Sequence, residues 1–74
     1  MPEHTYKVIE IVGSSPTSWE DAAHRALTQA SKSIKDLRIA EVVEQDIKIE
    51  NGNIVAFRTR LKVSFRFHDD LAHA

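Results

Sequence analysis

The 74-residue sequence contains no cysteine. Without thiols the chain can form no disulfide, no zinc–thiolate site and no thiol nucleophile. A chain of this length forms one domain, and it buries too little of its surface for a large core. Since disulfides are excluded, we expect oligomerisation or an oxygen-bound metal to supply additional stability.

Glycine is also scarce, and no charge sign dominates. The two glycines, Gly13 and Gly52, each fit a turn, so there is no glycine-rich loop to hold a phosphate. Ten basic residues balance eleven acidic ones, which disfavours nucleic-acid binding driven by overall charge. The opening residues, MPEHTYKV, lack a basic-then-apolar signal, and no apolar run is long enough to span a membrane. We therefore expect a cytoplasmic protein.

Motifs for catalysis are missing as well. The sequence has neither a Gly-x-Ser-x-Gly elbow nor a paired-histidine spacing. The histidines are expected near the N-terminus, on the solvated side of a helix and in the C-terminal tail: His4, His24, His68 and His73. We therefore expect a protein that is not an enzyme.

The first half of the chain predicts a strand followed by a helix. Residues 5–13, TYKVIEIVG, are rich in β-branched side chains and end in glycine, which is typical of a strand. Ser18 with Asp21 resembles a capping box, with Asp in place of Glu or Gln. Apolar or small residues then recur at 19, 23, 26, 27, 30, 34 and 37, which predicts a helix ending near Asp36 or Arg38. The side chains off this stripe should face water: His24, Arg25, Gln29, Lys32 and Lys35.

The second half predicts a hairpin. The stretch RIAEVVEQD, residues 38–46, indicates a strand, and Asn51-Gly52 favours a tight turn because both turn positions need positive φ. Residues 54–67 alternate throughout, with Thr59 as the one polar break on the apolar face. The apolar face holds Val55, Phe57, Leu61, Val63, Phe65 and Phe67, and the basic face holds Arg58, Arg60, Lys62 and Arg66.

The predicted order is thus β-α-β-β in a single α+β domain, residues 1–74. We expect an ordered core over about residues 5–67 and a flexible tail over 68–74. A last strand of about 14 residues is too long for one helix to cover unless the sheet bends round it. Its exposed edges invite pairing with other subunits, so we expect an oligomer.

The acidic residues Glu44 and Asp46 form a candidate metal site. Residues two apart in a strand share a face, and Ca²⁺ prefers six to eight oxygen ligands. Backbone carbonyls, waters or another chain would have to complete the shell. The alternative is an ordinary solvated strand in which Lys48, on the same face, neutralises Asp46.

Two further features also allow two interpretations. The basic face could bind a phosphate-bearing ligand, or its cations could pair with acids on neighbouring strands or subunits. Trp19 could stack on a ligand, although its place on the helical stripe favours a core or interface anchor.

Three segments resemble the dodecins: YKVIEIVGSSPTSWEDAAHRAL, SKSIKDLRIAEVVE and RLKVSFRF, which span nearly all of residues 6–67. The resemblance implies a three-stranded antiparallel sheet wrapped around one helix. It also implies a hollow homododecamer of cubic-type symmetry.

The resemblance further implies a flavin site, such as one for FMN or riboflavin, but this sequence departs from it. Ile39 stands where the family has a stacking tryptophan, Arg58 replaces a glutamine, and Asp46 replaces an arginine. Only Arg66 matches the pattern. Flavin storage, with Arg58, Arg66 and Ile39 as a degenerate flavin seat, is therefore the alternative function.

The segments SPTSWE and VVEQD are similar to the calcium dodecin of mycobacteria. We therefore expect a non-enzymatic shell that sequesters small ligands or ions and binds calcium. Glu44 and Asp46 are the candidate ligands by geometry, with Asp36, after the helix, as a further candidate. A structural oligomer without a ligand is the remaining alternative.

Overall fold

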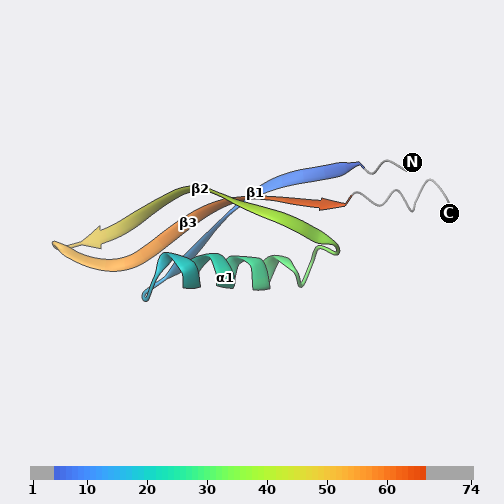
Figure 1. The fold of residues 1–74 in the computed structure, drawn as a ribbon. Coiled ribbons are helices and arrows are strands. Elements are labelled where there is room, and N and C mark those ends of the chain that lie inside the picture. Colours follow the sequence, from blue (N-terminus) through green and yellow to red (C-terminus); the bar gives the residue numbers. More distant parts are fainter. Residues whose placement is uncertain (1–4, 67–74) are drawn as a thin grey trace.

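The computed structural model describes residues 5–66, which form one strand, one helix and two further strands (Figure 1). These are β1 (Tyr6–Ser15), α1 (Trp19–Ala30), β2 (Leu37–Glu50) and β3 (Asn53–Arg66). The strands form one antiparallel sheet in the order β1-β3-β2, so β3 is central. The predicted α+β class and β-α-β-β order are confirmed. Phe67 and the predicted tail over 68–74 lie outside the described residues.

Gly13 lies within β1, so the prediction that it forms a turn is wrong. A side chain at Gly13 would overlap the carbonyl oxygen of Ala22, and its Cβ would lie 2.9 Å from the Cβ of Ala26. The missing side chain therefore lets α1 lie directly against β1. Ala22 is fully buried in this contact, although it is not part of the predicted helical stripe.

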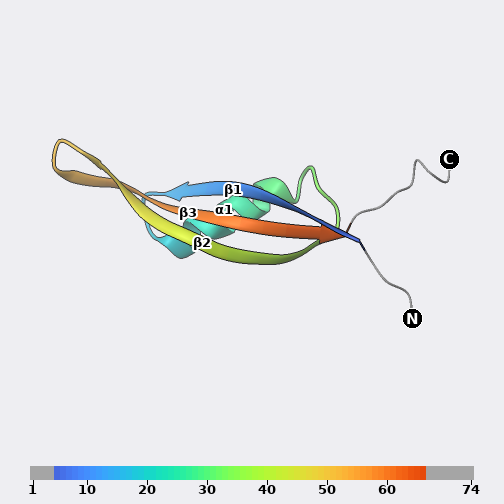
Figure 2. The same ribbon diagram turned by 90° about the horizontal axis from the view of Figure 1, so that it is seen from above.

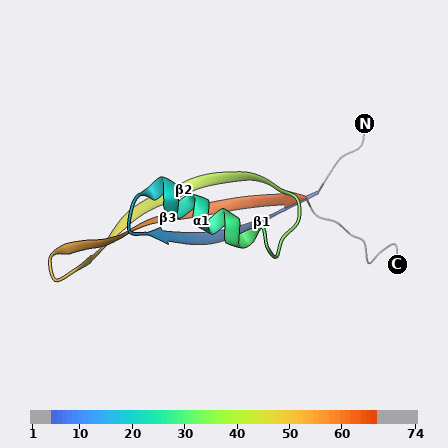
Figure 3. The same cartoon turned by 90° about the horizontal axis from the view of Figure 1, so that it is seen from below.

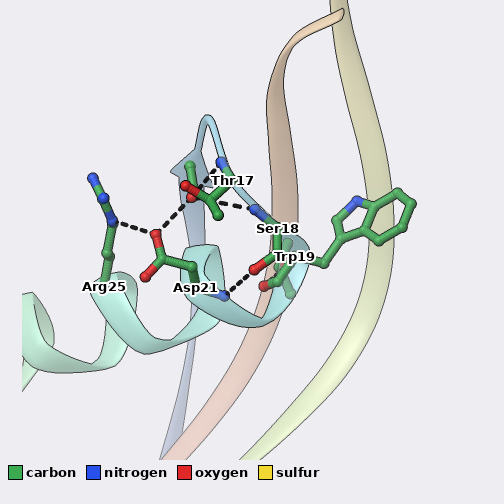
Figure 4. A network of polar contacts seen from close by, with 7 residues as sticks. Thr17, Ser18, Trp19, Asp21 and Arg25 are labelled. Carbon is green, nitrogen blue, oxygen red and sulfur yellow. Dashed lines mark hydrogen bonds and ion pairs between the residues drawn. The ribbon is translucent and has the colours of Figure 1, made fainter.

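The predicted N-cap is confirmed. The Ser18 hydroxyl accepts a hydrogen bond from the backbone N–H of Asp21 at 3.0 Å. Instead of completing a capping box, the Asp21 carboxylate accepts from the hydroxyl of Ser15 and from Nε of Arg25, both at 2.6 Å (Figure 4). Ser15 is buried and also accepts from the N–H of Thr17 at 3.0 Å. This network joins the end of β1 to the first turn of α1.

The predicted helix end near Asp36 or Arg38 is wrong, because α1 ends at Ala30. The hydroxyl of Ser31 donates to a carbonyl three residues earlier, at 2.8 Å. Serine competes in this way with regular helical bonding, so it favours a helix end. Asp36 then adopts a φ of 61°, in the left-handed region, just before β2 begins. The last two members of the predicted stripe therefore lie outside the helix.

The hairpin is confirmed by its backbone angles. Asn51 and Gly52 have φ values of 52° and 78°, as the predicted tight turn requires. The arm formed by β2 and β3 runs past the start of α1 and twists beyond it (Figure 2).

The helix packs on β1 and β3, and it crosses one face of the sheet diagonally (Figure 3). Beneath it, Thr59, Leu61 and Val63 of the central strand are buried. No residue of β2 is buried, and Val42 and Val43 on this strand are 53% and 44% exposed. One helix thus covers two strands and leaves the third bare. Among the described residues, no helix has the length and apolar character needed to cross a membrane.

Candidate functional site

The sheet face that points away from α1, here called the outer face, carries alternating charges. Neighbouring residues of a strand point to opposite faces, so burial of residues 59, 61 and 63 beneath α1 places Arg58, Arg60 and Lys62 on the outer face. Their register partners on β2 are Asp46, Glu44 and Glu41. The outer face is therefore a basic central strand with an acidic strand beside it.

Asp46 and Arg58 form a two-point ion pair. Nε of Arg58 donates to Oδ1 of Asp46 at 2.6 Å, and Nη2 donates to Oδ2 at 2.7 Å. Hydrogen bonding to Arg58 lowers the pKa of the Asp46 carboxyl, and the carboxylate raises the pKa of Arg58. Lys48, the alternative partner of Asp46, pairs instead with Glu50, with 3.5 Å between Nζ of Lys48 and Oε2 of Glu50. The carboxylate of Asp46 is thus ionised, and Arg58 engages both of its oxygens.

Glu44 shares the outer face with Asp46, as predicted. Nε of Arg60 lies 3.2 Å from Oε1 of Glu44, and Nη1 of the same arginine lies 3.8 Å from Oε1 of Glu10 on β1. The interpretation that the basic face pairs with neighbouring acids is therefore confirmed for Arg58 and Arg60. Both acids remain partly exposed, so their ion pairs are accessible to solvent.

Trp19 anchors the start of α1 to the same part of the sheet. Its indole Nε1 donates to the backbone carbonyl of Asp46 at 3.0 Å, and its ring meets Phe57 edge-on at 5.2 Å between centroids. Figure 4 shows the indole extending from α1 across β3 towards β2. The carbonyl of Trp19 accepts from the buried hydroxyl of Thr59 at 2.9 Å, which explains the polar break on the apolar face. The interpretation of Trp19 as an anchor is confirmed.

The other candidate residues lie at the opposite end of the sheet. The carbonyl of Asp36 accepts from the N–H of Arg66 at 3.1 Å, and Ile39 is 67% exposed opposite Ser64. Ser64 is six residues from Arg58 along β3, or about 20 Å at the rise of a strand. A single chain therefore brings Glu44, Asp46 and Arg58 together but keeps them apart from Asp36, Ile39 and Arg66.

A groove of about 360 Å³ lies between the second half of α1 and the start of β2. Its apolar wall includes Leu27, Leu37, Ala40 and Val63, and His24 also lines it. The groove marks the place where the helix leaves β2 uncovered.

Within residues 5–66, no three His, Cys, Asp or Glu side chains gather closely enough to hold a metal ion. Glu44 and Asp46 supply two carboxylates, which is only part of a calcium shell. A second contributor is needed for any complete site.

Comparison with known proteins identifies the family. The family model described as Dodecin matches residues 5–68. This chain belongs to the dodecin family. A calcium dodecin of Mycobacterium tuberculosis is 48% identical over 61 residues, which cover 82% of this chain and 86% of that protein. The predicted resemblance to dodecins, and to a mycobacterial calcium dodecin, is confirmed.

Solved structures agree with the fold. A dodecin from Streptomyces coelicolor superposes with a TM-score of 0.88 at 36% identity, covering 93% of this chain and 99% of that one. The calcium dodecin structure from M. tuberculosis gives 0.80 at 45% identity, covering 88% of this chain and 93% of that one. That protein is described as calcium-chelating, with a novel calcium-binding site.

Proposed function

We propose that this dodecin is a non-enzymatic, cytoplasmic shell that binds calcium through Glu44 and Asp46. The observation that carries the proposal is this pair of partly exposed carboxylates on one face of β2, in a chain 48% identical to a calcium dodecin. Carboxylate oxygens are ligands that Ca²⁺ prefers.

The calcium shell requires more oxygen ligands than Glu44 and Asp46 supply. The two acids supply part of six to eight oxygens, and waters, backbone carbonyls or another copy supply the rest. Asp36 pairs through its backbone with Arg66, eight residues from Arg58, so it lies about 25 Å away along the sheet. It can join the site only from a neighbouring copy.

The bare strand β2 supports assembly into the homododecamer that the family resemblance implies. Exposed apolar side chains on β2 and the open groove beside it are surfaces that a monomer rarely leaves uncovered. We expect Ala40→Glu to dissociate the particle, because the new charge would lie in the apolar groove, whereas Ala40→Ser should assemble normally. Sedimentation of the unmodified protein as a folded monomer of 8.4 kDa would contradict the proposed assembly.

Calorimetric titration with Ca²⁺ tests the proposed ligands. We expect heat of binding for the unmodified protein and a strong reduction in Asp46→Asn and Glu44→Gln. Glu50→Gln is the matched control, because Glu50 is an exposed acid of the same strand that pairs with Lys48. Equal heats for all four proteins would show that the ion binds elsewhere.

Flavin storage is the alternative function, with Arg58, Arg66 and Ile39 as the candidate flavin-binding residues. Two features argue against it: Ile39 offers no aromatic face, and Arg58 is engaged by Asp46. We expect added riboflavin to keep its fluorescence in the presence of the protein. Strong quenching would favour flavin storage, and a protein that responds to neither ligand would be a structural oligomer.

A further inference from the structure

We infer that Arg58 is a built-in competitor for the calcium site and sets its affinity, because its guanidinium and a divalent cation cannot both occupy the same side of the Asp46 carboxylate. This inference rests on the proposed calcium function. It assigns Arg58 the role of a specificity-determining residue, rather than that of a ligand or a passive surface charge.

The geometry of the ion pair carries the inference. Nε and Nη2 of Arg58 lie 2.6 and 2.7 Å from the two oxygens of Asp46, so one planar fork faces the whole carboxylate. Calcium binds carboxylate oxygens at 2.3–2.6 Å. An ion at that distance on the same side would sit against the guanidinium, where like charges repel. Chelation of the ion by both oxygens on this side of the carboxylate therefore requires Arg58 to leave.

The two partners differ in how freely they can move. The backbone at Asp46 is held by the hydrogen bond from Trp19 and by pairing with β3. Arg58 has a long side chain that is 44% exposed, so its guanidinium can swing into solvent while its backbone stays in the central strand. Binding thus leaves the carboxylate in place and displaces the arginine.

The neighbouring pair repeats this arrangement less tightly. Nε of Arg60 lies 3.2 Å from Oε1 of Glu44, and the same guanidinium also faces Glu10 at 3.8 Å. When Arg60 releases Glu44, it can stay near Glu10. Release of Asp46 by Arg58 therefore costs more free energy than release of Glu44 by Arg60. For this reason Arg58 has the larger effect on the affinity for calcium.

Calcium titration of Arg58→Gln tests the inference. Loss of a surface ion pair should strengthen calcium binding about three- to fivefold. Arg58→Lys should give a smaller gain, because lysine keeps the charge but loses the two-point fork. Lys62→Gln is the matched control, because it removes a positive charge from the same face of β3 while leaving Asp46 paired. It should change the affinity less than twofold.

Two additional measurements separate competition from a structural role. In the absence of calcium, Arg58→Gln should unfold at a lower denaturant concentration than the unmodified protein. It should nevertheless bind calcium more tightly. If the role of Arg58 were purely structural, its loss would lower both the stability of the fold and the affinity for calcium. Trp19 is the only tryptophan of the chain and contacts Asp46 directly, so its fluorescence provides a second binding signal.

The outcomes distinguish this inference from the proposed function. Equal or weaker binding in Arg58→Gln, with normal binding in the unmodified protein, would overturn the competitor role and leave calcium binding intact. Binding in Arg58→Gln alone would support the competitor role and contradict calcium binding by the native chain. Absence of binding in both would overturn both.

Discussion

The two edge strands of the sheet flank the same central strand, but only one of them is covered. On β1, the absence of a side chain at Gly13 admits the backbone of α1, and Ala22 is buried against it. On β2, apolar residues such as Val42 and Val43 remain exposed. A single twelve-residue helix covers about two strands, so the second edge is the surface that the proposed assembly would cover with another copy of the chain.

The largest expected effect comes from disrupting the contact between β1 and α1. Gly13→Val should destabilise the fold by at least about 3 kcal/mol, because the new side chain would overlap backbone atoms that cannot move without displacing α1. Urea unfolding monitored by circular dichroism measures the loss. Gly52→Ala is the control: it meets no neighbouring atom, but its φ of 78° is unfavourable for alanine, so it should cost about 1 kcal/mol. Similar losses for the two variants would contradict the close approach at Gly13.

A second comparison uses two residues that face each other across β2 and β3. Leu61 is buried and its register partner Val42 is half exposed. Leu61→Ala should cost about 3 kcal/mol at any protein concentration, because it leaves a cavity in the core. Val42→Ala should cost less than about 0.5 kcal/mol in dissociated chains and more in the assembled particle. Denaturation over a range of protein concentrations tests this, and a constant small cost for Val42→Ala would show that no copy covers this residue.

Local sequence signals account for most of the fold. The positive φ at Asn51 and Gly52 and the cap at Ser18 depend on nearby backbone, so the sequence predicts them correctly. The role of Gly13 depends instead on α1 lying across it, and no local pattern distinguishes that contact from a turn. The predicted helix end is wrong because Ile34 and Leu37 keep the helical spacing beyond Ala30, where α1 ends.

The candidate site was predictable only in part. The two-residue period of a strand correctly places Glu44 and Asp46 on one face. The partner of Asp46 depends on cross-strand register, which selects Arg58 over the sequence neighbour Lys48. The bond from Trp19 to the backbone of Asp46 joins positions 27 residues apart, so it emerges only in the folded chain.

A smaller effect is expected where α1 meets β3. Thr59→Val should cost about 1 kcal/mol, because it removes the hydroxyl that donates to the carbonyl of Trp19 while keeping the shape. Thr59→Ser keeps that donor, so Trp19 fluorescence should shift in the valine variant and not in the serine variant. A valine variant as stable as the unmodified protein would show that this bond does not anchor the helix.

The smallest expected effect is a loss of stability in acid. Hydrogen bonds from Ser15 and then Arg25 lower the pKa of Asp21, and the bond from Arg58 lowers that of Asp46. A carboxyl whose pKa is lower in the folded chain stabilises the fold above its unfolded value of about 4 and loses that contribution as the pH falls through its folded value. Stability should therefore decline below about pH 4, and less steeply in Asp21→Asn and Asp46→Asn. Urea midpoints at pH 7, 4 and 3 test this. If neither variant flattens the decline, the acid sensitivity arises elsewhere, and if only Asp46→Asn does, the exposed outer face outweighs the helix start.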